Sequence, residues 1–196
     1  MDNGGKKVFH PKYELTEANN PLLREELEIF PFVNSPNDPI EFAYELVEHM
    51  LYYGGMGLAA NQLGLPYRVF AIAAQPALVC YNPFIIDTSS EEIDLDEGCL
   101  TFPNVFFKVR RPKSIRIRYQ RPNGEIVTET YVGMTARIMQ HELDHLNGIL
   151  FIDHISKLKL DIALKKSAKY DQGYNKNPTL DFDTWMELNE NGEKNA

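Results

Sequence analysis

The stretch Gln140-His141-Glu142-Leu143-Asp144-His145 decides how this chain is interpreted. Two histidines stand four residues apart, and a glutamate directly follows the first. On a helix this spacing brings both imidazoles to one face, one turn apart, where two neutral rings can hold a divalent metal ion. Glu142 would then reach a metal-bound water. Because this motif also arises by chance on surface helices, the rest of the chain must supply a third ligand and a pocket.

The length and composition of the chain fit one globular domain. Its 196 residues, 43% of them hydrophobic, suffice for a single sizeable core. The formal net charge of -8 argues against nonspecific binding to nucleic acid or to anionic membranes. We therefore expect no direct DNA binding and no membrane association.

The compartment is judged from the cysteines and from the first residues. Cys80 and Cys99 are too few for a disulfide framework, and residues 1–7 lack the apolar core of a signal peptide. No apolar run is long enough to span a bilayer. A reducing cytoplasm is the simplest interpretation, and an organellar or phage-encoded protein fits the sequence as well.

Hydrophobic periodicity predicts a mixed α+β fold. Helices are expected at 39–53, 135–146 and 156–168, and strands at 68–74, 78–81, 105–109, 114–119 and 126–132. Asn82-Pro83 is expected to end the second strand, and residues 87–97 to form an acidic solvated loop. Leu158 and Ile162, with Leu164 as a further candidate, are expected to dock the last helix. We predict a central metal-binding helix surrounded by antiparallel β-sheets.

One catalytic domain is predicted between two polar segments. We place it at residues 21–170, after an N-terminal extension of residues 1–20. Residues 171–196 are rich in Asn, Asp and Glu and are expected to form a loosely attached tail, which Phe182 and Trp185 could anchor in part.

Two residues compete for the place of third metal ligand. His154 is the one histidine downstream of His145. Cys99 lies upstream, after a glycine in a loop-like stretch, and a metal strongly stabilises a thiolate beside it. Cys80 lies in the middle of an expected strand and is interpreted as a small buried hydrophobe.

Three stretches together resemble the signature motifs of peptide deformylase. They are Gly55-Met56-Gly57-Leu58-Ala59-Ala60-Asn61-Gln62, Glu97-Gly98-Cys99-Leu100-Thr101 and the opening stretch 140–145. Their order and approximate spacing agree with that family, and the resemblance covers roughly residues 20 to 165. One motif alone would be weak, whereas all three in order make chance a poor explanation.

The resemblance implies a role for each matched residue. Cys99, His141 and His145 would hold the metal, and Glu142 would act as the general base. The Gln62 side chain and the Leu100 backbone N–H would stabilise the oxyanion. The residues implied to contact the substrate, through main chain or pocket walls, are Gly55, Met56, Gly57, Glu97 and Gly98.

The resemblance also implies a reaction and a cofactor. The reaction would be removal of the N-formyl group from the N-terminal formyl-methionine of nascent polypeptides, with release of formate. The expected cofactor is one Fe(II) ion, although thiolate and imidazole ligands suit zinc, nickel or cobalt as well. We further expect a monomer. A weak contact with the ribosome is expected through the helix at Lys157–Lys169, which holds five lysines and one aspartate.

Two other functions stay open on the sequence alone. A zinc endopeptidase could use the same histidines with His154 or a carboxylate as third ligand. A catalytically silent protein could use the metal only for stability. Two structural assignments accompany these alternatives: Asp144 is expected to pair with Arg111, and Arg137 is expected to be a structural partner or a rim residue.

Overall fold

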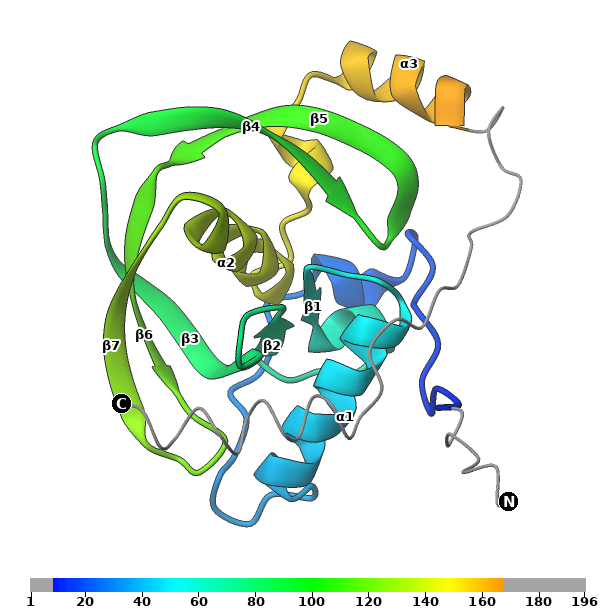
Figure 1. The fold of residues 1–196 in the computed structure, drawn as a ribbon. Helices are drawn as coiled ribbons and strands as arrows, with labels where there is room; N and C mark the ends of the chain where they lie inside the picture. Colours follow the sequence, from blue (N-terminus) through cyan, green and yellow to red (C-terminus); the bar gives the residue numbers. More distant parts are fainter. Residues whose placement is uncertain (1–8, 168–196) are drawn as a thin grey trace, which may run out of the picture.

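The computed structural model describes residues 9–167, and Figure 1 shows their arrangement. The helices are α1 (Pro39–Tyr52), α2 (Gly133–Leu146) and α3 (Lys157–Ser167), with short 3-10 turns η1 (Pro21–Arg24), η2 (Ala60–Leu63) and η3 (Phe151–His154). The strands are β1 (Gly57–Ala59), β2 (Val69–Ile72), β3 (Leu78–Thr88), β4 (Glu92–Cys99), β5 (Phe102–Pro112), β6 (Ser114–Gln120) and β7 (Ile126–Val132).

The strands form two antiparallel sheets with α2 between them. The larger sheet has the order β1-β2-β3-β6-β7, and β4 pairs with β5 in a separate hairpin. Figure 1 shows α2 enclosed by the curved strands, with α1 below it and α3 outside the hairpin. The prediction of an α+β fold with a central helix surrounded by antiparallel sheets is confirmed.

Strand alternation explains why α2 becomes a buried helix. On β6, Ile115, Ile117 and Tyr119 are buried, whereas Arg116 and Arg118 between them are exposed. The buried side chains pack against one apolar stripe of α2, which includes Met139 and Leu146. The helix is thereby covered on its apolar side, and its polar residues are left to meet the β4–β5 hairpin.

Helix α1 begins where the sequence predicts. The Asp38 carboxylate accepts hydrogen bonds from the backbone N–H groups of Ile40 and Glu41, both at 2.9 Å, and Pro39 occupies the first turn. Its buried face, which includes Leu46 and Met50, packs against β1 and β2. The helix thereby supports β1, which lies within the first motif.

The prediction that Asn82-Pro83 ends a strand is wrong. Strand β3 continues to Thr88, and its pairing with β6 shifts register between Tyr81 and Phe84. Asn82 takes a φ of 50° there, and its side chain binds the Phe30 backbone N–H at 2.7 Å. The missing N–H of Pro83 is tolerated because the irregular pairing leaves no ladder bond at that position.

Most of the acidic stretch 87–97 is strand and not loop, contrary to the prediction. Strand β3 ends at Thr88, and after a connection at 89–91 strand β4 begins at Glu92 and pairs with β5 along its length. Carboxylates on its outer face meet cations across the hairpin, as in Glu92 with Arg110 at 3.1 Å and Asp96 with Lys108 at 3.7 Å. These charge pairs across the hairpin stabilise a strand in a segment whose acidic composition is typical of a solvated loop.

The predicted docking of α3 through Leu158 and Ile162 is also wrong. These side chains are 70% and 60% exposed, and the partly buried Ala163 packs beside Phe151 instead. Lys169 and the segment 171–196, with Phe182 and Trp185, lie outside the described residues. Within the described part, no helix combines the length and apolar character needed to cross a membrane.

The residues that precede η1 pack onto α1 through a buried histidine. The Phe9 ring meets the His49 ring edge-on, with centroids 5.2 Å apart. His49 is 1% exposed, its Nε2 accepts the Tyr13 backbone N–H at 3.0 Å, and its Nδ1 lies 2.6 Å from the Glu45 carbonyl. Both ring nitrogens are therefore satisfied by the neutral imidazole.

Acidification should weaken this attachment. Burial lowers the pKa of His49 below its ordinary value, an effect that Glu45 opposes and Lys12 supports. As the pH falls, His49 therefore takes up its proton at a higher pH in the unfolded chain than in the folded one. The stability contributed by the neutral imidazole is complete above about pH 6.5, the ordinary pKa, and is lost as the pH falls through the lower pKa of the folded chain. Protonation also removes the acceptor for the Tyr13 N–H, which costs on the order of 1 kcal/mol.

Thermal unfolding at pH 7.5 and pH 5.5 measures this effect. Because acidification also acts on other groups of the chain, the relevant quantity is the difference between the wild-type chain and His49→Gln, whose amide does not titrate. We expect a smaller loss of stability on acidification in the variant. Equal losses in the two proteins would contradict this assignment.

Candidate active site

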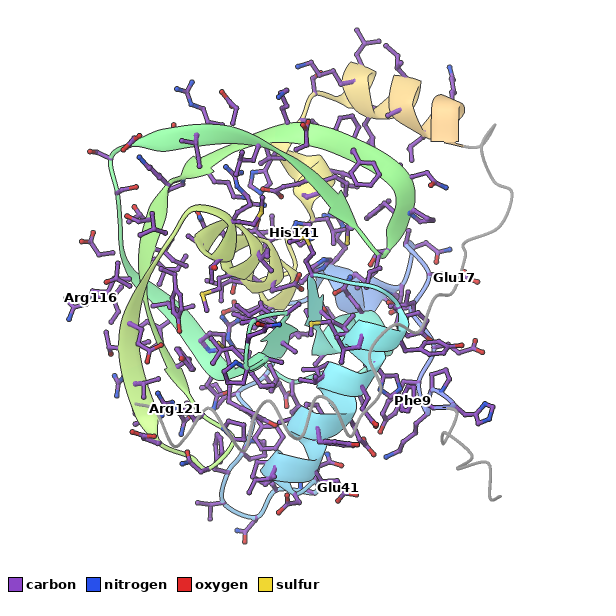
Figure 2. All side chains as sticks on the ribbon, in the orientation of Figure 1. Phe9, Glu17, Glu41, Arg116, Arg121 and His141 are labelled. Carbon is purple, nitrogen blue, oxygen red and sulfur yellow. The ribbon has the colours of Figure 1, made fainter. Side chains whose placement is uncertain are left out.

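Helix α2 presents His141, Glu142 and His145 to the interior. The three side chains are buried, with exposures of 8%, 4% and 1%. The two imidazole rings stand on one face with centroids 5.2 Å apart, as the four-residue spacing predicts. Figure 2 shows His141 inside the molecule, whereas Arg116 and Arg121 point outward from the sheet.

Cys99 joins the two histidines from the end of β4. Its Sγ lies 3.2 Å from His145 Nε2, and the three potential ligand atoms all lie within 4.8 Å of one another. A register shift between Gly98 and Cys99 turns this residue out of the regular ladder. His154, the competing candidate, instead places its Nε2 2.8 Å from Asp144 Oδ2.

The charges around Cys99 favour a thiolate. Burial alone would raise the pKa of the Cys99 thiol, but His145 and His141 outweigh that effect and lower the pKa well below its ordinary value. A thiolate and two imidazoles form a complete donor set for a divalent metal ion with one coordination position left open. Cys80 differs sharply, since it is fully buried in β3 and its pKa is raised by burial.

The Glu97 carboxylate orients the His141 imidazole through its Nδ1 atom. The Glu97 carboxylate is buried, and its Oε2 lies 3.0 Å from His141 Nδ1. Arg111 binds both carboxylate oxygens, at 2.7 and 3.0 Å, and Arg137 binds Oε1 at 2.8 Å. Burial acts to raise the pKa of Glu97, but these partners lower it well below the ordinary range. An ionised carboxylate here orients the imidazole so that Nε2 faces the site.

This arrangement changes the expectation for residue 97. Its side chain is occupied by two arginines and a histidine, so it does not line the mouth of a substrate groove, and only its main chain is left for that role. Arg111 also binds Asp144 at 2.6 Å, and Arg137 binds the carbonyl oxygens of Val109 and Ile93. The pairing expected for Asp144 and the structural role expected for Arg137 are thereby found.

Glu142 lies against a glycine in β1. A Cβ added to Gly57 would stand 2.8 Å from both Cγ and Cδ of Glu142 and would overlap Oε1, so only glycine leaves the carboxylate its place. Among the described residues, Glu142 Oε2 is buried and has no hydrogen-bond partner. Burial raises the pKa of Glu142 to about 7, which suits a group that accepts and returns a proton near neutral pH.

Gln62 reaches the site from η2. Its Oε1 accepts the Ala59 backbone N–H at 2.9 Å, which directs the amide Nε2 toward Cys99 Sγ at 3.4 Å and Thr101 Oγ1 at 3.2 Å. Leu100 directly follows the candidate ligand and packs in the core beside α1. The Gln62 amide of the first motif thus lies against Cys99 and Thr101 of the second.

The remaining motif glycines mark close approaches of the chain. A Cβ on Gly55 would stand 2.7 Å from the Gly57 carbonyl oxygen, and one on Gly98 would stand 2.5 Å from the Phe106 ring. Met56 between the first two glycines is 57% exposed. Glycine at these positions leaves room for other parts of the same chain to pack closely.

Asn61 was missed by the sequence interpretation. It is fully buried, and its Nδ2 donates to the His145 carbonyl oxygen at 2.7 Å. The residue thus ties η2 to the last turn of α2, next to Gln62. Two adjacent amides in an otherwise apolar stretch were the signal that could have revealed it.

A separate cavity of about 370 Å³ lies on the neighbouring face of α2. It is lined by Arg68, Phe84, Ile85, Arg111, Gln140, Leu143, Asp144 and Asn147. None of the candidate ligands lines it. We therefore locate the active site by its converging donor atoms and not by this cavity.

Known proteins share this chain's sequence and fold. A family model described as polypeptide deformylase matches residues 12–161. The chain belongs to the peptide deformylase family. The matched region begins at residue 12, within the N-terminal extension predicted for residues 1–20. The boundary of that extension at residue 20 stays a prediction.

Individual deformylases agree with this membership. The chain is 39% identical to the peptide deformylase of Wolbachia pipientis over 148 residues, which cover 68% of this chain and 83% of the relative. It is 38% identical to that of Thermotoga petrophila over 156 residues, covering 79% and 93%. The solved deformylase of Synechococcus elongatus in complex with actinonin superposes with a TM-score of 0.75 at 33% identity, covering 83% of this chain and 90% of that one.

Membership of the deformylase family gives the chain its reaction. It is a hydrolase that removes the N-formyl group from nascent peptides, and its substrates are formylated peptides. The cluster of Cys99, His141 and His145 supports a metal ion in this chain. The identity of the metal does not follow from these three ligands.

Replacement of Glu97 by glutamine should loosen this deformylase site. The change removes a buried charge while Arg111 and Arg137 remain, so we expect a loss of about 3 kcal/mol in the free energy of unfolding. Metal affinity should fall roughly 10- to 100-fold, because His141 loses its orienting partner. Competition with a chelator measures the affinity, and denaturant unfolding measures the stability.

Asp96→Asn is the matched control for this change. It neutralises the adjacent β4 carboxylate, which is 66% exposed and pairs with Lys108 at 3.7 Å. We expect this control to stay within about 0.5 kcal/mol of the wild-type chain with unchanged metal affinity. A Glu97→Gln variant that bound metal as tightly as Asp96→Asn would disprove the orienting role.

Proposed function

We propose that Cys99, His141 and His145 hold one divalent metal ion and that Glu142 performs the proton transfers of deformylation. The observation that carries this proposal is the buried Glu142 carboxylate, with one oxygen unpaired, beside three converging metal donors. A buried carboxylate without a partner is costly unless it has a function at that place.

The donor set of one thiolate and two imidazoles accepts several first-row divalent metals. When bound, the ion would act as a Lewis acid that makes water nucleophilic near neutral pH. We propose Fe(II) as the physiological metal from the resemblance to the family, with zinc, nickel or cobalt as substitutes that the same ligands accept. A thiolate ligand to Fe(II) is prone to oxidation, which suits a reducing compartment.

Glu142 moves the proton in two steps. Its carboxylate first accepts a proton from the water whose oxygen attacks the formyl carbon. As the C–N bond breaks, the same group gives that proton to the departing amine, and formate is released with the free methionyl N-terminus. The pKa of about 7 that burial gives Glu142 lies where both steps are possible, and a nearby cation would lower it.

Two N–H donors stabilise the oxygen that becomes negative. We propose the Gln62 Nε2 amide and the Leu100 backbone N–H for this role, as the resemblance implies. The Ala59 N–H holds Gln62 Oε1, so the amide cannot turn its acceptor toward the oxyanion. A fixed donor needs no reorganisation during the reaction, which is the main advantage of such a site.

The substrate chain is proposed to run along exposed backbone of both motifs. Gly55, Met56 and Gly57 would form one side, and Gly98 with the main chain of Glu97 the other. The exposure of Met56, 57%, supports access of a peptide to the first of these segments. A solved deformylase from Acinetobacter baumannii, 30% identical and with a TM-score of 0.68, is bound to Met-Ala-Ser, a deformylated product of this kind.

Glu142→Gln should separate proton transfer from metal binding. With formyl-Met-Ala-Ser as substrate, we expect formate release to fall at least about 100-fold, because the general base is lost. The metal should stay bound, since Glu142 is not a ligand. Anaerobic purification followed by metal analysis measures this, with one iron per chain expected in the wild-type protein.

Two cysteine variants provide the complementary test. Cys99→Ala should lose metal and activity together, whereas Cys80→Ala, at a fully buried position in β3, should keep both. A Cys99→Ala variant that kept its metal and its activity would favour the endopeptidase, whose third metal ligand would be His154 or a carboxylate. A wild-type protein that binds metal without releasing formate would favour the catalytically silent alternative.

We also propose a cytoplasmic monomer with a weak ribosome contact through α3. Figure 1 shows α3 outside the hairpin, and its lysines 157, 159 and 165 are exposed. The acidic net charge of the whole chain makes this basic helix stand out. Attraction to ribosomal RNA would be electrostatic and would weaken as salt is added.

Removal of the chain after residue 155 tests the ribosome contact. We expect weaker co-sedimentation with ribosomes, while hydrolysis of formyl-Met-Ala-Ser by the truncated protein stays within about twofold because α3 carries no site residue. Exchange of the three exposed lysines for glutamine in the full chain should have the same effect on sedimentation. Unchanged affinity in both variants would refute the contact.

A further inference from the structure

Asn61 is a buried amide that joins two parts of the active site. It lies in η2, directly before Gln62, whose amide is the proposed oxyanion donor. The Asn61 Nδ2 donates a hydrogen bond of 2.7 Å to the backbone carbonyl oxygen of His145. One side chain therefore connects the turn that carries the Gln62 amide to the helix that carries two of the metal donors.

The carbonyl group that Asn61 binds lies in the last turn of α2. Carbonyl groups in the last turn of a helix lack the N–H partner that a further turn would supply, so their partners must come from elsewhere. The Gly148 N–H reaches the His145 oxygen at 3.3 Å, which is longer than the bond from Asn61. The Asn61 amide thus supplies the shorter of these two hydrogen bonds and restrains the turn that carries His145.

The two candidate ligands on α2 are held in different ways. His141 Nδ1 lies 3.0 Å from the Glu97 carboxylate, which orients the ring directly. His145 Nδ1 is buried, and no residue that the structure describes forms a hydrogen bond with it. The position of the His145 imidazole therefore depends more on its own backbone, which is the part of the residue that Asn61 binds.

The turn η2 is held by the N-terminal segment as well as by α2. The Thr16 N–H donates to the Gln62 carbonyl oxygen at 2.8 Å, and the Thr16 hydroxyl lies 3.4 Å from the Asn61 carbonyl oxygen. These contacts fix the main chain of the turn, whereas the Asn61 side chain fixes its relation to α2. A hydrogen-bond donor is needed at that place, because the partner on α2 is a carbonyl oxygen.

We propose that Asn61 is a positioning residue that sets the distance between the Gln62 amide and His145. This inference rests on the proposed function, in which Gln62 stabilises the oxyanion and His145 holds the metal. A donor displaced by about 1 Å from its productive position can cost on the order of 100-fold in rate. Because Asn61 is fully buried, it acts through these two residues and not on the substrate, so its loss lowers kcat and leaves KM nearly unchanged.

Two substitutions remove the donor in different ways. Asn61→Ala deletes the amide, whereas Asn61→Asp keeps the shape of the side chain and replaces the N–H donor by an acceptor. In both we expect kcat for formyl-Met-Ala-Ser, expressed per bound metal ion, to fall roughly 10- to 100-fold, with KM within about twofold of the wild-type value. Expressing kcat per bound metal ion corrects for any loss of metal or of folded protein.

A second readout does not depend on activity. With Co(II) added as the metal, the visible absorption bands report the arrangement of the ligands around the ion. We expect these bands to shift in Asn61→Ala and in Asn61→Asp, because the turn that carries His145 is no longer restrained.

Asn82→Ala is the matched control, since it removes another amide that joins separate segments. The Asn82 Oδ1 accepts the Phe30 backbone N–H at 2.7 Å, and its Nδ2 donates to Gln120 Oε1 at 2.8 Å. None of these partners belongs to the active site. We expect this variant to lose thermal stability while kcat per bound metal ion and the Co(II) bands keep their wild-type values.

The outcomes separate the positioning role from the activity itself. Wild-type kcat and wild-type Co(II) bands in both Asn61 variants, with the wild-type protein active, would overturn the positioning role and leave the proposed function standing. An equal fall of kcat in Asn82→Ala would also overturn it, because the effect would then follow from general destabilisation. No hydrolysis of formyl-Met-Ala-Ser by the metal-loaded wild-type protein would overturn the proposed function together with the role of Asn61.

Discussion

The buried Glu97 carboxylate is the interaction on which the rest of the structure depends. It is 5% exposed and accepts hydrogen bonds from β5 through Arg111 and from α2 through Arg137 and His141. A buried charge is tolerated only when its partners are complete, and here the partners come from separate elements. The hairpin and the helix are thereby locked in one relative position, which is the position that brings Cys99 to the histidines.

This locking explains the division of work between the elements. In the proposed assignment, helix α2 supplies two metal ligands and the base at fixed spacing, and η2 supplies the amide of Gln62. The hairpin would supply the thiolate and the adjacent backbone N–H. Since only the hairpin carries Cys99, the metal site forms only when the hairpin is docked on α2. A deformylase site is thus a product of tertiary packing, although each of its motifs is local in sequence.

The sequence predicted those parts whose signals are local. Helix α2 and the strands around Ile117 followed from periodicity, and the family followed from three motifs in order, whose residues Cys99, His141 and His145 the fold brings together. The strand β4 was not predicted, because its acids gain their stability from Arg110 and Lys108, far along the chain. The clamp on Glu97 was hidden for the same reason. The composition of a segment describes that segment alone. The partners that stabilise its charges lie on other segments that pack against it, so they cannot be predicted from its composition.

Strand β4 shows how one acidic segment serves two environments. Its alternation sends Asp94 and Asp96 to solvent and Glu97 inward, so adjacent carboxylates differ completely in exposure and role. The same period places Gly98 on the outer face and Cys99 toward the metal, with the register shift between them. Because a one-residue slip would exchange the two faces, the pairing of β4 with β5 determines both the metal site and the surface along which a peptide can lie.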